Sequence, residues 1–388
     1  MKLFVILSRV PWPLEKGDKL RAWYQLKELS KKHEICLVCI SDSPIDTEAR
    51  KQLEKFCKEV HIFRMHKAGM FFRLLLGLFS KLPFQVLYFH QKSIHRKTER
   101  IIARFKPDHI FCQLIRCSEY VKNIHHIPKT LDYMDSFSKG VERRIPLAGF
   151  FARPFFKSET RRLVEYENLI FDYFEHKCII TLQDRQNIYH PDQEQIAIIP
   201  NGVDFDFFHP IEREKKFDLV FNGNMNYPPN VDCVKYIAEE ILPLAKLKGR
   251  ELQFLISGAS PSPEVLALAK LPGVKVSGWV DDQRESYASA KVFIAPFRIG
   301  TGLQNKLLEA MAMEIPCITS RLANNALKAE KDSMILVADQ PEELVNSIFY
   351  LLDHPEISAQ MASRGAAYIR ETYNWSSSTS RLEQLMLS

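Results

Sequence analysis

Short apolar runs alternate with helical patterns along most of the chain. Continuous apolar runs such as residues 3–7 and 35–40 predict strands that are buried on both faces of a parallel sheet. Between such runs, apolar residues recur at three- and four-residue spacing, which predicts helices such as 48–56 and 158–174. This alternation indicates the α/β class, with a doubly wound parallel sheet that binds ligands at the carboxyl ends of its strands. Further strands are expected at residues 60–63, 109–112, 130–136, 178–182, 196–199, 217–221, 252–257, 292–296, 317–319 and 334–337.

The alternating pattern is interrupted once and then starts again. A turn sequence at residues 200–204 is followed by a polar, charged segment that extends to Lys216. A chain of 388 residues is also too long for one ordinary core, so two domains are expected. The predicted organisation is a Rossmann-like domain over 1–200, a linker over 201–217, a second Rossmann-like domain over 218–370 and a helix over 371–388 that crosses back to the first domain.

A glycine-containing turn lies between the strand expected at 292–296 and a helix that begins at Leu303. Gly300 and Gly302 lie in this turn, where backbone N–H groups at the helix N-terminus have no internal partner and suit a phosphate. Lys306 adds a positive charge, and Glu309 adds a carboxylate that can accept hydrogen bonds from two neighbouring hydroxyls, as on a ribose. An ordinary strand-to-helix turn with surface charges explains the same residues equally well.

Other polar residues follow predicted strands and are weaker candidates. Gly17 and Lys19 come in a basic loop after the first strand, which is either a second anion site or a plain loop with solvated lysines. Arg116 and Asp135 each follow a buried strand and are expected to face a cleft. A surface arginine and a capping aspartate remain the alternatives for these two residues.

Composition limits the classes of ligand and the cellular compartment that are expected. A formal net charge of +6 and a pI near 8.7 favour a soluble protein that meets anionic ligands or an anionic membrane surface, and no nucleic-acid recognition module is recognisable. The eight cysteines are scattered, and Cys36 and Cys39 point to opposite faces of one predicted strand. Buried free thiols and the lack of a secretory signal predict the cytoplasm.

Two aromatic and basic segments leave two interpretations open. Residues 70–79 form the most apolar window, which is too short to span a bilayer and contains Arg73. Residues 150–157 combine four phenylalanines with Arg153 and Lys157. Both segments fit core packing or a position in a membrane interface with the basic side chains on the headgroups. Core packing is expected for most of these residues, and an anionic membrane surface remains a candidate partner.

Several motifs together resemble one enzyme family. They are Lys-Gly-Asp-Lys at 16–19, Pro-Asn-Gly-Val-Asp at 200–204, the asparagine- and proline-rich loop 222–232, Gly-Trp-Val at 278–280, the stretch 302–312 and Tyr-Asn-Trp at 373–375. With these motifs the chain resembles the family 4 glycosyltransferases of GT-B fold, in which two Rossmann-like domains face a cleft. Among them it is similar to the bacterial sugar transferases of exopolysaccharide systems, of the PEP-CTERM-associated type.

The resemblance implies a donor site for a nucleotide-diphospho-sugar in the C-terminal domain. Glu309 matches the family glutamate that contacts ribose, whereas Thr301 stands where the other family glutamate touches the donor sugar. The loop 222–230 lacks the arginine and lysine that family members carry for the diphosphate, so Lys306 and Arg298 are expected to replace them. Trp279 and Val280 correspond to the loop that binds the nucleotide base in the family. The expected donor-binding residues are Gly17, Lys19, Asn222, Gly223, Asn226, Trp279, Val280, Arg298, Gly300, Thr301, Gly302, Leu303, Lys306 and Glu309.

The resemblance also implies a reaction. A sugar would pass to a glycan or lipid-linked acceptor with retention of configuration, in surface polysaccharide or exopolysaccharide biosynthesis. Lys306 is the expected catalytic cation, and Asp135 and Arg116 are expected on the acceptor side. Asp204 and Asp206 form a D-x-D without a third ligand nearby, so neither metal nor another cofactor is expected.

These expectations leave rival functions open. An epimerase or hydrolase of the same fold would use the nucleotide-sugar without transfer, and a non-catalytic protein would only bind it. We expect Lys306→Ala to abolish transfer, Glu309→Ala to weaken nucleotide binding, and activity to survive a chelator.

Overall fold

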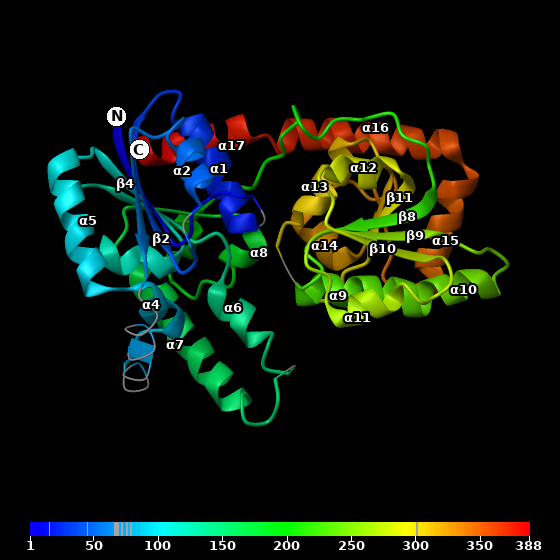
Figure 1. The fold of residues 1–388 in the computed structure, drawn as a ribbon, viewed down its shortest axis with the longest axis horizontal. Helices are drawn as coiled ribbons and strands as arrows, with labels where there is room; N and C mark the ends of the chain where they lie inside the picture. Colours follow the sequence, from blue (N-terminus) through cyan, green and yellow to red (C-terminus); the bar gives the residue numbers. More distant parts are fainter. Residues whose placement is uncertain are drawn as a thin grey trace. The chain divides into compact units, whose positions relative to one another are not determined.

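The computed structural model describes residues 1–14, 16–44, 46–65, 70, 73–74, 77, 80–146, 148–299 and 302–388. The chain forms two compact units (Figure 1). The N-terminal unit contains Met1–Pro200 and Ser376–Ser388, and the C-terminal unit contains Asn201–Trp375. The last helix therefore belongs to the unit in which the chain begins.

The N-terminal unit is built on a seven-stranded parallel sheet with the strand order β3-β2-β1-β4-β5-β6-β7. The strands are β1 (Lys2–Leu7), β2 (Glu34–Ser41), β3 (Glu59–Arg64), β4 (His109–Gln113), β5 (Lys129–Asp132), β6 (His176–Ile179) and β7 (Ala197–Ile198). The helices are α1 (Gly17–Leu29), α2 (Thr47–Leu53), α4 (Phe84–Phe89), α5 (Lys92–Phe105), α6 (Phe137–Glu142), α7 (Arg153–Phe171), α8 (Leu182–Arg185) and α17 (Trp375–Leu387), with 3₁₀ turns η2 (Ile115–Tyr120) and η3 (Gln193–Gln195).

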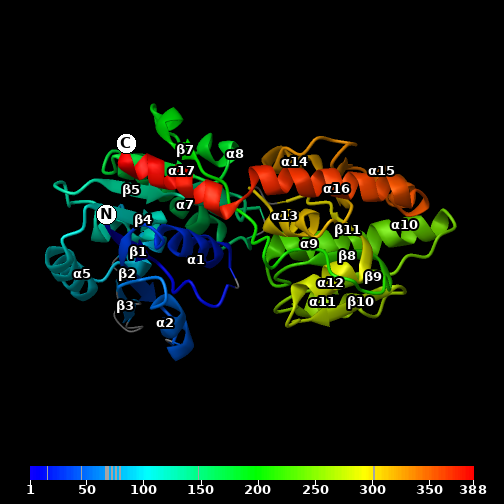
Figure 2. The ribbon, with the colours of Figure 1, turned by 90° about the horizontal axis from the view of Figure 1, so that it is seen from above.

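Helices cover both faces of this sheet, which explains its continuous apolar strands. Leu3, Val5 and Leu7 of β1 pack in one core with α1, α2 and α17, whereas Phe4 and Ile6 pack in a second core with α4, α5 and α7. Figures 1 and 2 show α1 and α17 together over the sheet. The apolar run at the start of the chain is thus confirmed as a strand that is buried on both faces.

The C-terminal unit repeats this plan with six parallel strands in the order β10-β9-β8-β11-β12-β13. The strands are β8 (Phe217–Asn222), β9 (Phe254–Ser257), β10 (Val274–Gly278), β11 (Ala290–Ala295), β12 (Cys317–Thr319) and β13 (Leu336–Val337). The helices are α9 (Pro228–Tyr236), a π-helical turn η4 (Ile237–Ile241), α10 (Leu242–Leu247), α11 (Pro263–Leu268), α12 (Gln283–Ala288), α13 (Asn305–Ala312), α14 (Arg321–Leu327), α15 (Pro341–Asp353) and α16 (Pro355–Thr372).

The turn sequence 200–204 packs against the segment that precedes α17. The backbone N–H of Val203 donates to the carbonyl oxygen of Tyr373 at 2.9 Å, and Val203 pairs with Asn374 in an isolated parallel bridge. A Cβ on Gly202 would lie 2.4 Å from the backbone nitrogen of Trp375, so only glycine fits this approach. The two turn motifs of the sequence therefore meet within the C-terminal unit.

Three expectations about local structure are wrong. The strand expected at 130–136 ends at Asp132, because Met134 adopts a φ of +63° that a strand cannot continue through. The strand expected at 178–182 ends at Ile179, because the side chain of Thr181 caps α8. Residues 150–151 do not pack in a core, as described below.

Among the helices in the described part of the chain, none is both long and apolar enough to cross a bilayer. The apolar window 70–79 lies largely outside the described residues.

Candidate active site

The carboxyl ends of two neighbouring strands build the main polar cluster of the C-terminal unit. β8 and β11 are adjacent in the sheet, and β8 ends at Asn222. The chain that leaves β11 leads to α13, whose first turns carry Lys306 and Glu309. The side chain of Asn201 donates to Asn305 Oδ1 at 3.2 Å and so holds the start of α13 to the turn at 200–204. The sheet order thus brings distant segments to one edge.

Lys306 is a partly buried cation with few polar neighbours. Its Nζ donates to Gln304 Oε1 at 3.0 Å and lies 5.0 Å from the ring centre of Phe297. A Cβ on Gly223 would lie 3.1 Å from Lys306 Cε, so this glycine leaves room for the lysine. Burial lowers the Lys306 pKa to about 8, although the negative charge of Glu309 works against this shift. The lysine is therefore protonated at neutral pH, and an anionic ligand would stabilise its charge.

Glu309 is oriented by a tyrosine. The hydroxyl of Tyr287, on α12, donates to Glu309 Oε2 at 2.8 Å. Burial raises the pKa of Glu309, whereas the tyrosine hydrogen bond and Lys306 oppose that rise. Among the described residues, the other carboxylate oxygen, Oε1, has no hydrogen-bond partner. One oxygen is thus fixed, and the other can accept a ligand hydroxyl.

The glycine turn itself is described only in part. Gly300 and Thr301 lie outside the described residues. Gly302 has a φ of +83°, which favours glycine, and Leu303 is partly buried against the core. The expectation that this turn binds phosphate therefore stays a prediction.

Arg298 is already paired with carboxylates. Its guanidinium donates to Asp232 at 2.7 and 3.2 Å and to Glu240 at 3.2 Å, and it lies 4.2 Å from the ring centre of Tyr236. These carboxylates raise the pKa of Arg298, with the Asp232 hydrogen bond as the largest cause. Lys306 is therefore the better suited of the two proposed cations, because a diphosphate would compete with two carboxylates for Arg298.

The remaining donor candidates of this unit lie at the same edge of the sheet. Asn226 is exposed in the loop after β8, where its backbone N–H donates to Asn224 Oδ1 at 3.0 Å. Trp279 is 63% exposed immediately after β10, and Val280 is partly buried. An indole so exposed is available to pack against a ligand.

Gly17 and Lys19 lie in the first turn of α1 in the N-terminal unit. The preceding residue, Lys16, makes no side-chain cap to the helix, and a Cβ on Gly17 would meet no atom within 4 Å. The backbone at this helix start is thus open on its own side. Its proposed approach to the donor stays a prediction.

Arg116 lines a cavity of about 640 Å³ in the N-terminal unit. Its Nε and Nη2 donate to Gln85 Oε1 at 3.1 and 2.6 Å, and the guanidinium lies 4.7 Å from the ring centre of Phe137. Burial and the nearby Arg9 lower the Arg116 pKa to about 10. Arg9 and Arg144 also line this cavity, so three guanidinium groups border a space with aromatic walls.

Asp135 has an exposed side chain shortly after β5. Protein atoms around the carboxyl and the negative charge of Asp184 raise its pKa to about 7, and Arg116 opposes this rise. Asp135 and Arg116 are close enough for each charge to affect the pKa of the other group. The expectation that both lie on the acceptor side stays a prediction.

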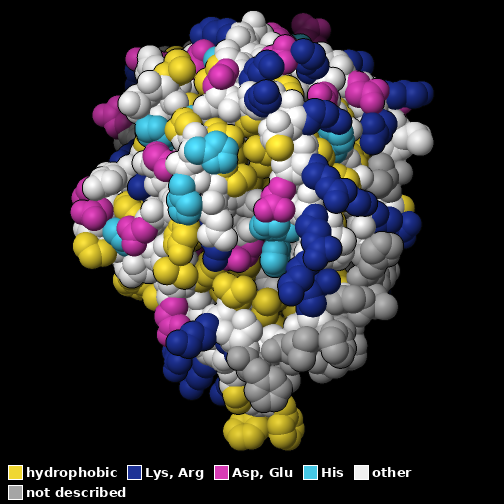
Figure 3. Space-filling view, turned by 90° about the vertical axis from the view of Figure 1, so that its left-hand side faces the viewer, with side chains coloured by type: hydrophobic (Ala, Val, Ile, Leu, Met, Phe, Trp, Pro, Cys, Tyr) yellow, Lys and Arg dark blue, Asp and Glu magenta, His cyan; other side chains and the backbone are white. Residues whose placement is uncertain are grey.

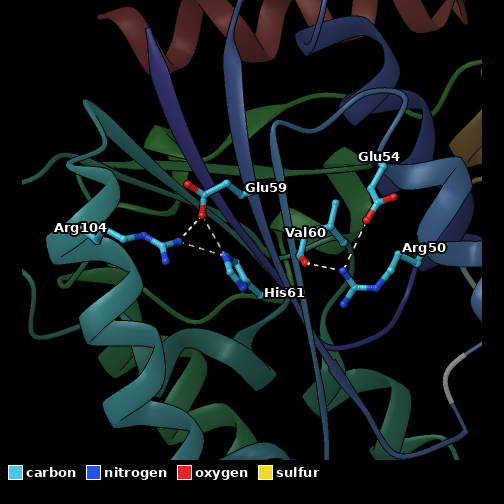
Figure 4. A network of polar contacts seen from close by, with 6 residues as sticks. All are labelled: Arg50, Glu54, Glu59, Val60, His61 and Arg104. Carbon is cyan, nitrogen blue, oxygen red and sulfur yellow. Dashed lines mark hydrogen bonds and ion pairs between the residues drawn. The ribbon is translucent and has the colours of Figure 1, made fainter.

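Potential metal ligands form one group among the described residues. Cys36 Sγ, a Glu59 oxygen and a His61 nitrogen lie within 4.8 Å of one another on β2 and β3. Arg104, from α5, reaches both Glu59 and His61 (Figure 4), and burial raises the Cys36 pKa to about 12. The Arg104 guanidinium thus already supplies a positive charge at Glu59 and His61, where a metal ion would bind. The Cys36 thiol stays protonated.

Asp204, the first aspartate of the D-x-D, has a local structural role. Asp204 Oδ1 accepts hydrogen bonds from the backbone N–H groups of Asp206 and Phe207 at 3.1 and 3.3 Å. This pattern closes the turn after residue 203.

All eight cysteines are free and buried.

Sequence reasoning missed Tyr287, Gln304 and Gln85, the partners that orient Glu309, Lys306 and Arg116. Tyr287 lies 22 residues from Glu309 in another helix, and its apolar spacing is typical of a core residue. Gln304 was detectable as a polar residue beside the candidate lysine.

Comparisons with known proteins agree with this architecture. Residues 216–354, which include Lys306 and Glu309, match a sequence family described as Glycosyl transferases group 1. An uncharacterized 44.6 kDa protein in the cps region of Klebsiella pneumoniae is 22% identical over 395 residues, which cover 96% of each chain.

Solved structures resemble the whole chain at low sequence identity. HepE from Anabaena in complex with UDP is 13% identical with a TM-score of 0.68, over 99% of this chain and 98% of that one. A glycosyltransferase from Rickettsia africae is 12% identical with a TM-score of 0.69, over 99% and 97% of the two chains. Sucrose-phosphate synthase from Thermosynechococcus elongatus is 13% identical with a TM-score of 0.67, over 99% and 98%. The chain therefore has the GT-B fold, and its C-terminal unit carries the sequence pattern of group 1 glycosyl transferases.

Proposed function

We propose that this protein is a glycosyltransferase of the hexosyltransferase type. It would move a sugar from a nucleotide-diphospho-sugar to an acceptor. The observation that carries the proposal is the cluster of Lys306, Glu309 and Tyr287 inside the segment that matches group 1 glycosyl transferases. The similar HepE fold has been solved with UDP-glucose, which supports a nucleotide-sugar as the donor class.

The residues of this cluster suit the two polar parts of such a donor. During transfer the bond between the anomeric carbon and the diphosphate oxygen breaks, and negative charge develops on the leaving phosphate. The Lys306 ammonium would stabilise that charge, since a fixed cation in a partly desolvated site costs little reorganisation. The free Glu309 oxygen would accept a hydrogen bond from a ribose hydroxyl while Tyr287 holds the carboxylate in place.

The acceptor would bind in the N-terminal unit. The cavity that Arg116 lines has the volume of a ligand pocket, and its aromatic walls and guanidinium groups suit a sugar with an anionic substituent or a lipid-linked glycan. Asp135 is a candidate proton acceptor, because its pKa of about 7 lies near neutral pH. In the C-terminal unit, Asn222 and Gly223 at the end of β8 would contact the donor.

The biological setting is proposed from the relatives. Similarity to a protein of a cps region supports a role in surface polysaccharide or exopolysaccharide biosynthesis. We also propose a cytoplasmic location, because all eight cysteines are free. We further propose that transfer retains the anomeric configuration and needs no metal, since Lys306 can supply the charge at the phosphate.

A labelled-donor assay tests the proposal. The protein is incubated with nucleotide-sugars labelled in the sugar, with a lipid and glycan fraction as acceptor, with and without a chelator. Label in the acceptor fraction supports transfer. Free labelled sugar or an epimerised donor would indicate a hydrolase or an epimerase, and an unchanged donor that still binds would indicate a binding protein. If the chelator abolishes activity and magnesium or manganese restores it, the proposal that transfer needs no metal is wrong.

The matched control separates the site from general damage. Lys306→Met should lose transfer, whereas Lys270→Met, at an exposed lysine of the same unit, should keep it. Equal activity in both variants would contradict the assignment of Lys306.

A further inference from the structure

We infer that the N-terminal unit docks on an anionic lipid bilayer through the loop before α7 and the first turns of that helix. This docking surface consists of an aromatic tip, Phe150, Phe151 and Phe155, and a basic cavity beside it. It lies outside the polar cluster of the C-terminal unit, and it does not depend on the proposed glycosyl transfer.

The aromatic tip is unusually exposed. Phe150 is 79% and Phe151 is 94% exposed, and Phe155 in the first turn of α7 is 46% exposed. The rings of Phe150 and Phe151 lie 5.6 Å apart at an interplanar angle of 82°, so they contact each other more than the protein. Large apolar side chains clustered in this way mark an interaction site rather than ordinary surface. The expectation that these residues pack in the core is therefore wrong for Phe150 and Phe151.

An arginine anchors the loop that carries the tip. Arg153 Nε donates to the carbonyl oxygen of Ala148 at 3.1 Å, and its Nη2 donates to that of Pro146 at 3.4 Å. The exposed rings thus project from a held turn. Figure 3 shows hydrophobic side chains gathered at the lower end of the face it presents, with Lys and Arg side chains on the same face.

A basic cavity of about 410 Å³ lies along the same helix. Its lining contains four cations, two hydroxyls and one carboxylate, namely Lys81, Lys157, Arg161, Arg162, Ser80, Ser158 and Glu165. Lys157 and Arg161 follow Arg153 at four-residue spacing and so share one face of α7. Arg162 is held in position, since its Nη1 donates to the carbonyl oxygen of Gly77 at 2.7 Å. Such a lining matches the phosphates of lipid headgroups.

The two features together fit a bilayer surface better than a dissolved anion. Phenylalanine side chains on an interfacial segment can be buried at the boundary between headgroups and acyl chains, and Lys or Arg near an anionic leaflet contributes about 1 kcal/mol each. Phe155 lies three and seven residues before Ser158 and Arg162, which line the cavity, and so shares a face of α7 with them. The ring of Phe84 lies 5.0 Å from Phe155 and 4.8 Å from the Arg162 guanidinium, so the aromatic tip and the basic cavity can meet one surface together. A dissolved phosphate would use the cavity and leave the phenylalanines in water.

Vesicle co-sedimentation of the full chain tests this inference without any sugar donor. We expect the protein to bind vesicles of phosphatidylcholine with 30% phosphatidylglycerol at least tenfold more tightly than pure phosphatidylcholine, and less tightly as salt rises. Phe150→Ser with Phe151→Ser should weaken this binding at least tenfold. The control Leu247→Ser should leave it unchanged, because Leu247 is 85% exposed between two lysines of the C-terminal unit.

A charge variant tests the basic cavity separately. Lys157→Glu with Arg161→Glu should remove the preference for phosphatidylglycerol, whereas Lys270→Glu should keep it. No binding of the wild type to anionic vesicles would overturn the inference, as would wild-type affinity in the double phenylalanine variant. Self-association that depends on Phe150 and Phe151, with no vesicle binding, would instead assign the tip to a second copy of the chain. Because the readout is lipid binding alone, its failure leaves the proposed transfer activity standing.

Discussion

Each unit brings a cationic and an anionic side chain together near the carboxyl edge of its sheet, and the two pairs differ in how their charges are satisfied. In the N-terminal unit, Arg21 Nε donates to Asp132 Oδ2 at 2.6 Å, and both side chains are fully buried. In the C-terminal unit, Lys306 and Glu309 are partly accessible, and each is hydrogen-bonded to a neutral side chain instead.

This difference separates a structural pair from a binding site. Burial is the largest single influence and would lower the Arg21 pKa, but the charge and hydrogen bond of Asp132, together with Cys178, raise it overall. At Lys306 burial prevails and lowers the pKa. A cation that its own surroundings leave undercompensated is suited to receive an anionic ligand.

The largest expected effect is on stability, at the structural pair. Arg21→Met leaves Asp132 as a buried charge without its guanidinium, so we expect a loss of about 3–5 kcal/mol in the free energy of unfolding. Denaturant unfolding of the full chain measures this loss. Adding Asp132→Leu should recover part of it, because no uncompensated charge remains but the buried backbone N–H of Met134 loses its acceptor. If the single variant is as stable as the wild type, the pair is not a structural one.

The next effect is on catalysis, at Lys306. We expect Lys306→Met to lower kcat by about 100- to 1000-fold, as for the loss of one stabilising group at a developing anion. The melting temperature should stay equal or rise, because a partly buried charge is removed. Steady-state kinetics beside Lys270→Met measure the difference. A variant that loses activity only by unfolding would place Lys306 with Arg21 instead.

The depressed pKa of Lys306 predicts a pH dependence of moderate size. The protonated lysine is needed at the diphosphate, so kcat/KM should be retained below pH 8 and lost as the pH rises through about 8. At one unit above that pKa the loss should be about tenfold. In Lys306→Arg the fall should move to higher pH, since a guanidinium does not titrate there. A pH profile that is unchanged in this variant would assign the titration to another group.

The smallest effect is expected at Tyr287. Removing its hydroxyl in Tyr287→Phe should weaken donor binding by about fivefold, which corresponds to about 1 kcal/mol, with little change in kcat, because the hydroxyl acts only by orienting Glu309. Tyr350→Phe, at an exposed tyrosine of α15, serves as the control. Equal donor affinity in both variants would show that Glu309 does not need this orientation.

The sequence was sufficient for the two-sheet architecture because parallel strands that are buried on both faces leave continuous apolar runs. It also located the loops after β8 and β11, since glycines interrupt the pattern there. The partners could not be predicted: Tyr287 and Glu309 come from separate helices, and Arg21 and Asp132 are 111 positions apart. The burial of the aromatic tip was predicted wrongly, because an apolar pattern does not show whether Phe150 and Phe151 are buried in a core or exposed.

The central claim is that Lys306 binds the diphosphate of a nucleotide-sugar. Isothermal titration of a panel of nucleotide-diphospho-sugars, and of the corresponding nucleosides, into the wild type and Lys306→Met tests it most directly. We predict that the wild type binds one donor per chain, that Lys306→Met binds this donor at least 100-fold more weakly, and that nucleoside affinity is equal in the two proteins. Equal donor affinity in the wild type and in Lys306→Met would contradict the claim.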